Sequence, residues 1–146
     1  MKKSLLLLLS VFFCIYGSAQ KYELLSPDGK LKADIEINNG IFAKLLKGGS
    51  EIVRLENLSL ETTVISQQSS KYKVRKVTRR SVSEIIKPEI REKAWELLNA
   101  FSELELRFRA DYAITFRLFN EGLAYRFSTS LNEDLIIEKE NMNIIL

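Results

Sequence analysis

The 146-residue sequence contains no histidine, a single cysteine (Cys14), only two prolines and only six glycines. The absence of histidine removes the commonest general base and a common zinc ligand, and a lone cysteine forms no intramolecular disulfide. The scarcity of proline and glycine gives no sign of a linker or a low-complexity tract. Any chemistry would therefore depend on carboxylates, hydroxyls, lysine or tyrosine.

The first 19 residues have the pattern of a secretory signal peptide. The pattern consists of a basic start at Lys2 and Lys3, an apolar run over residues 5–16, and small residues just before position 20. The apolar run is shorter than the roughly 20 residues of a membrane-spanning helix. We therefore expect cleavage after Ala19, export to the periplasm or out of the cell, and no membrane association of the mature chain that begins near Gln20.

A lipoprotein signal that uses Cys14 is the alternative, but Phe12 and Phe13 occupy positions where such signals need small residues. Removal of the leader takes away the cysteine and two lysines, which brings the formal net charge of +3 close to zero. A nearly neutral chain implies no polyanionic partner, so we expect no nucleic-acid binding.

The rest of the chain, residues 20–146, is long enough for one compact domain and has mainly strand periodicity. Apolar and charged residues alternate in LKADIEI (31–37) and in ELELRFR (103–109). Glycine-containing segments at 26–30, 38–40 and 47–50 are typical of turns. The pattern predicts an antiparallel all-β fold.

Two charged segments have a plain structural interpretation. KYKVRKVTRR (71–80) is rich in lysine and arginine, as solvated edge strands often are. Glu103 and Glu105 share one face of a strand and resemble a catalytic carboxylate pair, but Arg107 and Arg109 follow on the same face. We expect a salt-bridged outer surface there, without catalytic residues.

The segment Pro88–Phe101 departs from the strand pattern. Its apolar residues have helical spacing, and proline suits the first turn of a helix. We expect a short helix or a crossing loop outside the sheets, with Trp95 in it.

The segment FRLFNEGLAYRF (116–127) reads as an antiparallel hairpin. Apolar side chains alternate along both arms, so Arg117 and Arg126 project to the opposite face. The connection Asn120–Gly122 ends in glycine, which is typical of a left-handed residue with a bulge.

This hairpin resembles a motif in the N-terminal domain of glycoside hydrolase family 97, which includes periplasmic α-glucosidases and α-galactosidases of Bacteroidetes. LLSPDGKLKADIEINNG (24–40) is similar to the opening strand pair of that domain, and NAFSEL (99–104) is similar to its Asn-x-Tyr-x-Glu-Leu element. The resemblance extends from Tyr22 to Glu140.

The resemblance implies an all-β fold: a large two-sheet antiparallel sandwich, incomplete at its C-terminus, with at most one short helix. It also implies an accessory domain that packs against a (β/α)₈ glycosidase barrel and associates with carbohydrate. The catalytic acid, the nucleophile or base, and the calcium ligands of the family lie outside the matched region. We therefore expect no catalytic, cofactor or metal residues in this chain and no activity from it alone.

Four residues are candidates for contacts with carbohydrate or with another domain: Trp95, Arg117, Glu121 and Arg126. One alternative is a free-standing carbohydrate-binding module, with Trp95, Tyr72 and Phe119 as candidate stacking platforms. Another is the product of a truncated gene with no independent role.

An incomplete sandwich would also leave apolar side chains uncovered. The expected residues are Phe116, Leu118, Leu123 and Tyr125. Because exposed apolar strands recruit other chains, we expect the isolated chain to be marginally stable and to self-associate.

Overall fold

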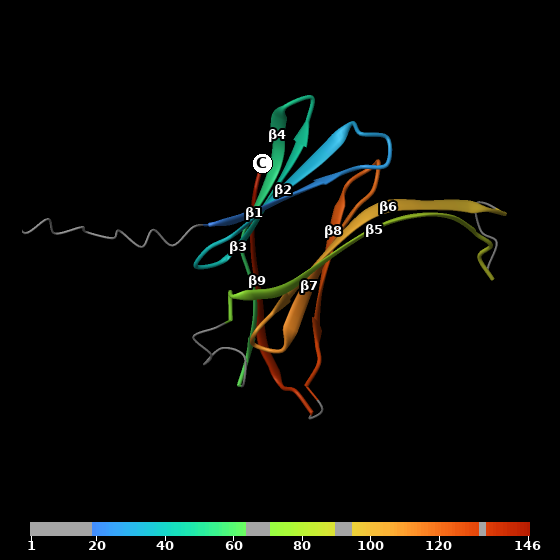
Figure 1. Cartoon of the computed structure of the whole chain (residues 1–146). Helices are drawn as coiled ribbons and strands as arrows, with labels where there is room; N and C mark the ends of the chain where they lie inside the picture. Colours follow the sequence, from blue (N-terminus) through green and yellow to red (C-terminus); the bar gives the residue numbers. More distant parts are fainter. Residues whose placement is uncertain (1–18, 64–70, 90–94, 132–133) are drawn as a thin grey trace, which may run out of the picture.

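The computed structural model describes residues 19–63, 71–89, 95–131 and 134–146 (Figure 1). The strands in these residues are β1 (Gln20–Leu25), β2 (Leu31–Ile37), β3 (Ile41–Lys47), β4 (Ser50–Thr62), β5 (Val74–Ile86), β6 (Leu97–Phe108), β7 (Tyr112–Leu118), β8 (Leu123–Thr129) and β9 (Ile137–Ile145). Within the same ranges, no helix is long and apolar enough to cross a membrane. The expected signal peptide lies almost entirely outside the described residues and stays a prediction.

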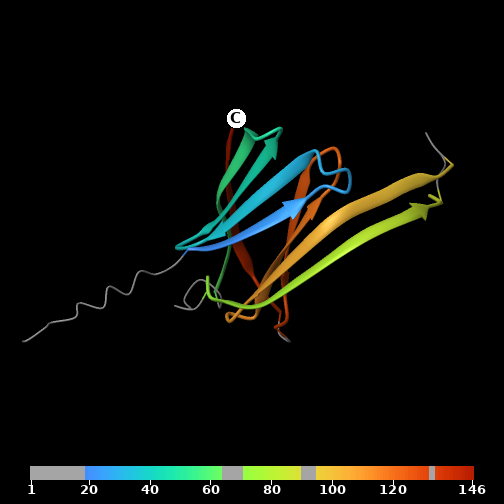
Figure 2. The ribbon, with the colours of Figure 1, turned by 45° about the horizontal axis from the view of Figure 1, so that its top comes forward.

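The strands form two antiparallel sheets that face each other. The first sheet has the order β1-β2-β3-β4-β9, and the second has the order β5-β6-β7-β8. The views in Figures 1 and 2 show the blue and green strands of the first sheet against the yellow and orange strands of the second. The prediction of an all-β, two-sheet antiparallel sandwich is therefore confirmed.

The core lies between the sheets and follows the two-residue period of the sequence. Strand β2 alternates regularly between buried and half-buried residues. The buried cluster draws on both sheets and includes Leu31, Ala33, Ile35, Ile37, Ile41, Ala43, Leu104, Leu106, Phe108, Ile114, Phe116 and Leu118. At about 25 cal/mol per Å² of buried apolar surface, this layer is the main source of stability.

The expected exposure of the hairpin side chains is wrong for two of the four residues. Phe116 and Leu118 are both fully buried, because β7 packs against β2 of the facing sheet. Leu123 and Tyr125 are partly buried, since β8 is the last strand of its sheet. The facing sheet thus covers the core side of β7, whereas the edge strand β8 is only partly covered.

The turns position the hairpin relative to the rest of the fold. Gly48 and Gly49 have φ angles of 57° and 85°, as the tight β3–β4 turn requires. By contrast, Gly122 does not have a positive φ angle, so the expected left-handed glycine of the β7–β8 turn is wrong. This turn is closed by the Phe119 N–H, which donates to the Gly122 carbonyl at 2.9 Å around Asn120 and Glu121. The Asn120 Oδ1 accepts the Asp28 N–H at 3.1 Å, which ties this turn to the β1–β2 turn of the other sheet.

Strands β5 and β6 continue past the sandwich as a projecting arm, defined here as residues 82–86 and 97–101 (Figures 1 and 2). Ile86 pairs with Leu97, and Val82 pairs with Phe101. The prediction of a helix or loop over Pro88–Phe101 is therefore wrong for its last five residues, because cross-strand pairing with β5 outweighs helical spacing. Residues 90–94 of that segment lie outside the described residues.

Strand β5 confirms the interpretation of the segment rich in lysine and arginine. Among the described strands it pairs with β6 alone and forms one edge of its sheet. Most of its side chains are exposed. Positive charge along such an edge discourages pairing with other chains.

Candidate functional site

The arginines of the β7–β8 hairpin lie on the outer face of the four-stranded sheet, as the alternation predicts. Arg117 pairs directly with Ala124, and Arg126 pairs directly with Thr115. Phe116 on the same hairpin points into the core, so the arginines point away from it. The hairpin thus has one face for folding and another that is available for contacts.

Arg117 shares a carboxylate with an arginine of the edge strand. The Arg117 Nε lies 2.7 Å from Glu103 Oε2, and the Arg80 Nε and Nη2 lie 2.5 and 3.0 Å from the two Glu103 oxygens. The three residues sit side by side in register across β5, β6 and β7. We call Arg80, Glu103 and Arg117 the outer triad.

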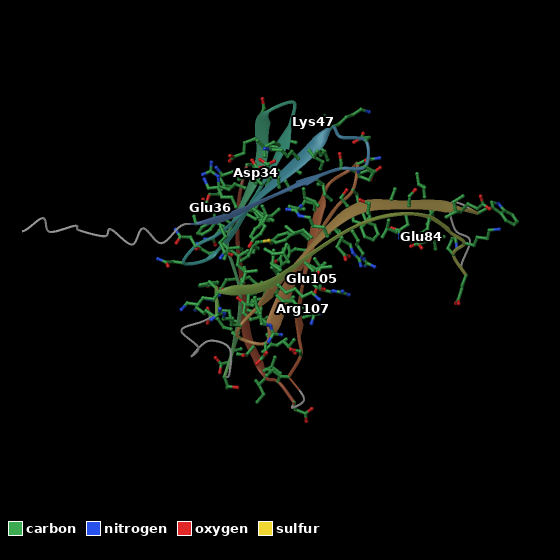
Figure 3. The ribbon with its side chains drawn as sticks, in the orientation of Figure 1. Asp34, Glu36, Lys47, Glu84, Glu105 and Arg107 are labelled. Atoms are coloured by element: carbon green, nitrogen blue, oxygen red, sulfur yellow. The ribbon has the colours of Figure 1, made fainter. Side chains whose placement is uncertain are left out.

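Glu103 is buried in this triad, with 9% of its side chain exposed. The expectation of a mostly exposed outer surface is therefore wrong at Glu103, because two arginines lie over its carboxylate. The expected salt bridge is present at Glu105, whose Oε1 accepts from Arg107 Nε at 2.5 Å, although only 25% of the Glu105 side chain is exposed. Figure 3 shows Glu105 and Arg107 near the base of the projecting arm and Glu84 farther out along it.

The triad shifts the pKa of two of its members, Glu103 and Arg80. The hydrogen bonds from Arg80, supported by Arg117, lower the pKa of Glu103 despite burial of the carboxyl. The same pairing raises the pKa of Arg80. A general acid needs a raised pKa, whereas Glu103 stays ionised near neutral pH. Its chemistry suits the positioning of arginines and does not suit proton donation.

An aromatic pair extends the triad toward the hairpin turn. The Arg117 guanidinium lies 4.5 Å from the ring centroid of Phe101, a cation–π distance. Phe101 is buried, and its ring lies 5.2 Å from that of Phe119. Phe119 is therefore a packing residue on this face, not an open stacking platform.

The other candidates lie apart from the triad. Trp95 precedes β6, outside any strand, and is 72% exposed. Tyr72 packs against the core, and the Lys71 Nζ lies 5.1 Å from the centroid of its ring. Glu121 is exposed in the β7–β8 turn. The structure thus brings Arg117 and Arg126 onto one surface and leaves Trp95 and Glu121 elsewhere.

A separate cavity of about 410 Å³ lies on the outer face of the five-stranded sheet. Its carboxylates are Glu23, Asp34, Glu36 and Glu56. Each of them has a basic partner: Lys32 Nζ lies 2.9 Å from Asp34 Oδ1, for example, and Lys21 Nζ lies 3.8 Å from Glu36 Oε2. Figure 3 shows Asp34 and Glu36 on this layer. No group of three or more His, Cys, Asp or Glu residues suited to a metal ion occurs in the described part of the chain.

Sequence reasoning missed two members of the outer face. Arg80 belongs to the basic segment, and nothing in that segment marks it as the partner of Glu103. Phe101 belongs to the segment with helical spacing, which hid its place in β6. Only the strand register, with Arg80 opposite Glu103 and Val82 opposite Phe101, reveals both.

Comparison with known proteins is consistent with this architecture. A retaining α-galactosidase of Bacteroides thetaiotaomicron is 36% identical over 128 residues, which cover 87% of this chain and 19% of that enzyme. Two structures of a glycoside hydrolase family 97 enzyme from Pseudoalteromonas sp. strain K8, one with panose and one with acarbose, each superpose with a TM-score of 0.66 at 17% identity. They cover 83% of this chain and 20% of the Pseudoalteromonas chain.

The chain thus spans about a fifth of the length of the relatives that it matches. Residues 24–146 match the family model described as Glycosyl-hydrolase 97 N-terminal. Both the sequence and the two-sheet fold agree with that match. The chain therefore belongs to the N-terminal domain family of glycoside hydrolase family 97.

Proposed function

We propose that the chain serves as an accessory β-sandwich of an exported glycoside hydrolase and is not catalytic by itself. Its partner would be the catalytic (β/α)₈ barrel of a full-length enzyme, and its role would be to support that domain and the carbohydrate site. The observation that carries the proposal is the match to the N-terminal family over residues 24–146, in a chain that spans about a fifth of its relatives.

The chemistry of the carboxylates supports this proposal. Glycoside hydrolysis needs two carboxyl groups either about 5–5.5 Å or about 6.5–9.5 Å apart across the bound sugar, one of them protonated to act as the acid. Glu103 is held ionised by Arg80 and Arg117, and the carboxylates around the cavity of the five-stranded sheet are in ion pairs with lysine or arginine. The lowered pKa of Glu103 makes it a poor proton donor.

An assay of the purified full chain tests the proposal. We expect no hydrolysis of 4-nitrophenyl α-galactoside or α-glucoside, with or without calcium. Turnover that disappears on replacement of one Glu or Asp of this chain would overturn it. Turnover that survives every such replacement would come from a contaminating enzyme. Further purification should then remove it.

The exposed indole of Trp95 favours a second candidate, a module that binds carbohydrate by itself. A tryptophan that is 72% exposed offers a face on which a sugar ring can stack. Titration of the chain with panose, followed by tryptophan fluorescence, tests this candidate. A saturable change that is lost in Trp95→Ala supports it, and an unchanged spectrum rejects it.

The proposal includes export, on the strength of the leader at residues 1–19. Mass spectrometry of the chain recovered from the periplasm or the medium should give a first residue at or near Gln20. An intact Met1, or a lipid on Cys14, would contradict this part of the proposal.

A further inference from the structure

A small hollow of about 200 Å³ lies beside the outer triad on the surface of β7 and β8. Thr115, Arg117, Ala124, Tyr125 and Arg126 line it. The register places Arg126 opposite Thr115 and Arg117 opposite Ala124, so the two arginines occupy diagonal corners of a four-residue patch. The two short side chains, from Thr115 and Ala124, leave room between the guanidinium groups.

The charges around this hollow are unbalanced. Arg80 and Arg117 share the single negative charge of Glu103. Glu105 is paired with Arg107. Arg126 has no ion pair within the described ranges, so this surface has an excess of positive charge. Two of these arginines line the hollow: Arg117, which uses its Nε for Glu103, and Arg126, which lies diagonally from it.

We propose that this hollow binds a carboxylate, and that the carboxylate is an aspartate or glutamate side chain of a protein segment packed on the four-stranded sheet. A guanidinium group presents paired N–H donors that match a carboxylate, and two such groups line this hollow. The volume is smaller than the roughly 300–1,000 Å³ of small-molecule sites, so one side chain fits it better than a sugar residue does.

The segment that supplies this side chain belongs to the remainder of a full-length family enzyme, because the chain spans only about a fifth of its relatives. In this respect the inference rests on the proposed function. Arg117 and Arg126 are then interface residues. The hairpin motif has a buried aromatic face for folding and, on its outer face, an arginine pair that binds the partner's carboxylate. The outer triad holds Arg117 in place before the partner arrives.

The test uses the full chain labelled with ¹⁵N and follows the Nε–Hε signals of its arginines by NMR. The probe is N-acetylglutamate α-methylamide, which carries one carboxylate, and its neutral counterpart is N-acetylglutamine α-methylamide. We expect saturable shifts of the Arg117 and Arg126 signals with the acid only. Equal shifts with both probes, or none with the acid, would overturn the site.

Variants show whether the effect depends on the hollow. Arg126→Gln should weaken binding of the acid at least about fivefold, which corresponds to about 1 kcal/mol. Arg126→Lys should retain part of it, since lysine keeps the charge without the planar fork. Lys76→Gln is the matched control: it removes one positive charge from the edge strand of the same sheet and should leave binding unchanged. An equal loss in Lys76→Gln and Arg126→Gln would show general charge attraction and refute the site.

A final experiment distinguishes a protein side chain from an acidic sugar as the source of the carboxylate. Glucuronate should bind no more tightly than the glutamate probe, and glucose should not shift the arginine signals. Binding of glucuronate ten times tighter or more would assign the hollow to acidic sugars and overturn the docking proposal. These results are independent of the hydrolysis assay, so failure of the carboxylate site leaves the proposed accessory role standing.

Discussion

Arg117 and Glu103 face each other directly across the β6–β7 pair, with the Arg117 Nε 2.7 Å from Glu103 Oε2. Arg80 holds the same carboxylate from the other side through two further hydrogen bonds. One buried acid thus joins three strands on the outer face of the sheet. One arginine of the hairpin, Arg117, is thus held in an ion pair, whereas Arg126 has none within the described residues.

The first prediction concerns the contribution of this acid to stability. Glu103→Gln keeps the shape of the side chain but removes the charge that both arginines contact. We expect the free energy of unfolding to fall by about 1.5–3 kcal/mol, the range for hydrogen bonds to charged groups. Urea denaturation followed by circular dichroism measures it.

Glu105→Gln is the matched control for this experiment. Glu105 lies on the same strand and face, but its pair with Arg107 is more exposed. Exposed pairs contribute about 0–1 kcal/mol, so the control should lose less stability than Glu103→Gln does. Equal losses in the two variants would show that burial of Glu103 does not increase its contribution to the free energy of unfolding.

The second prediction is the acid dependence of stability. The folded state lowers the pKa of Glu103 below its ordinary value of 4.5, chiefly through the hydrogen bonds from Arg80. The stabilisation is therefore present above pH 4.5 and is lost as the pH falls through the lowered pKa of the folded state. The stability difference between wild type and Glu103→Gln should shrink steadily below pH 4.5. A difference that stays constant down to pH 2.5 would contradict the assignment.

The third prediction concerns alkaline unfolding. Burial, with a hydrogen bond to Glu140, raises the pKa of Tyr125 from 10.0 to about 12. The unfolded chain loses this proton near pH 10 while the folded chain keeps it, so stability should decline between pH 10 and 12. Tyr125→Phe should decline less steeply over that range in chemical denaturation. Parallel curves for the variant and the wild type would argue against a partly buried Tyr125 that stays neutral up to about pH 12.

The fourth prediction concerns self-association through the projecting arm. Ile85 and Leu98 pair directly on it and are 62% and 71% exposed, beyond the reach of the facing sheet. Such exposed apolar strand surface recruits other chains. We expect the isolated chain to self-associate in sedimentation velocity, and Leu98→Lys to weaken the association about tenfold or more, since burying a leucine contributes about 1.5–3 kcal/mol.

Leu25→Lys controls for the effect of an added charge. Leu25 is also exposed, but it ends β1 and is not part of the arm. Association should persist in this variant. A monomeric wild-type chain would contradict the expected self-association outright, and it would raise the standing of the carbohydrate-binding module.

Sequence periodicity predicted the strands whose two faces differ in polarity. LKADIEI and ELELRF alternate so regularly that their buried faces follow from the sequence alone, and β2 and β6 confirm them. The same approach failed for residues 97–101. Helical spacing is a local property of the sequence, whereas the pairing with β5 that makes these residues a strand depends on a distant segment. It also failed for Glu103, because a strand pattern shows which face a residue occupies but not which side chains of neighbouring strands cover it.

The candidate site shows the same division. The outward direction of Arg117 and Arg126 follows from alternation within one hairpin, and the structure confirms it. The partnership of Arg80 with Glu103 and the hollow beside Arg126 depend on the register of four strands. A single sequence does not specify that register, so these features emerged only from the fold.

A domain replacement tests most directly the proposal that this chain serves as an accessory part of a larger family 97 hydrolase. The matching 128-residue region of the Bacteroides α-galactosidase is replaced by that of this chain, and a second protein lacks the region altogether. We predict that the chimera is soluble and hydrolyses α-galactosides with a kcat/KM within about tenfold of the parent, a barrier change of about 1.4 kcal/mol, while the deletion is insoluble or inactive. A chimera as inactive as the deletion, or a deletion as active as the parent, would contradict the account.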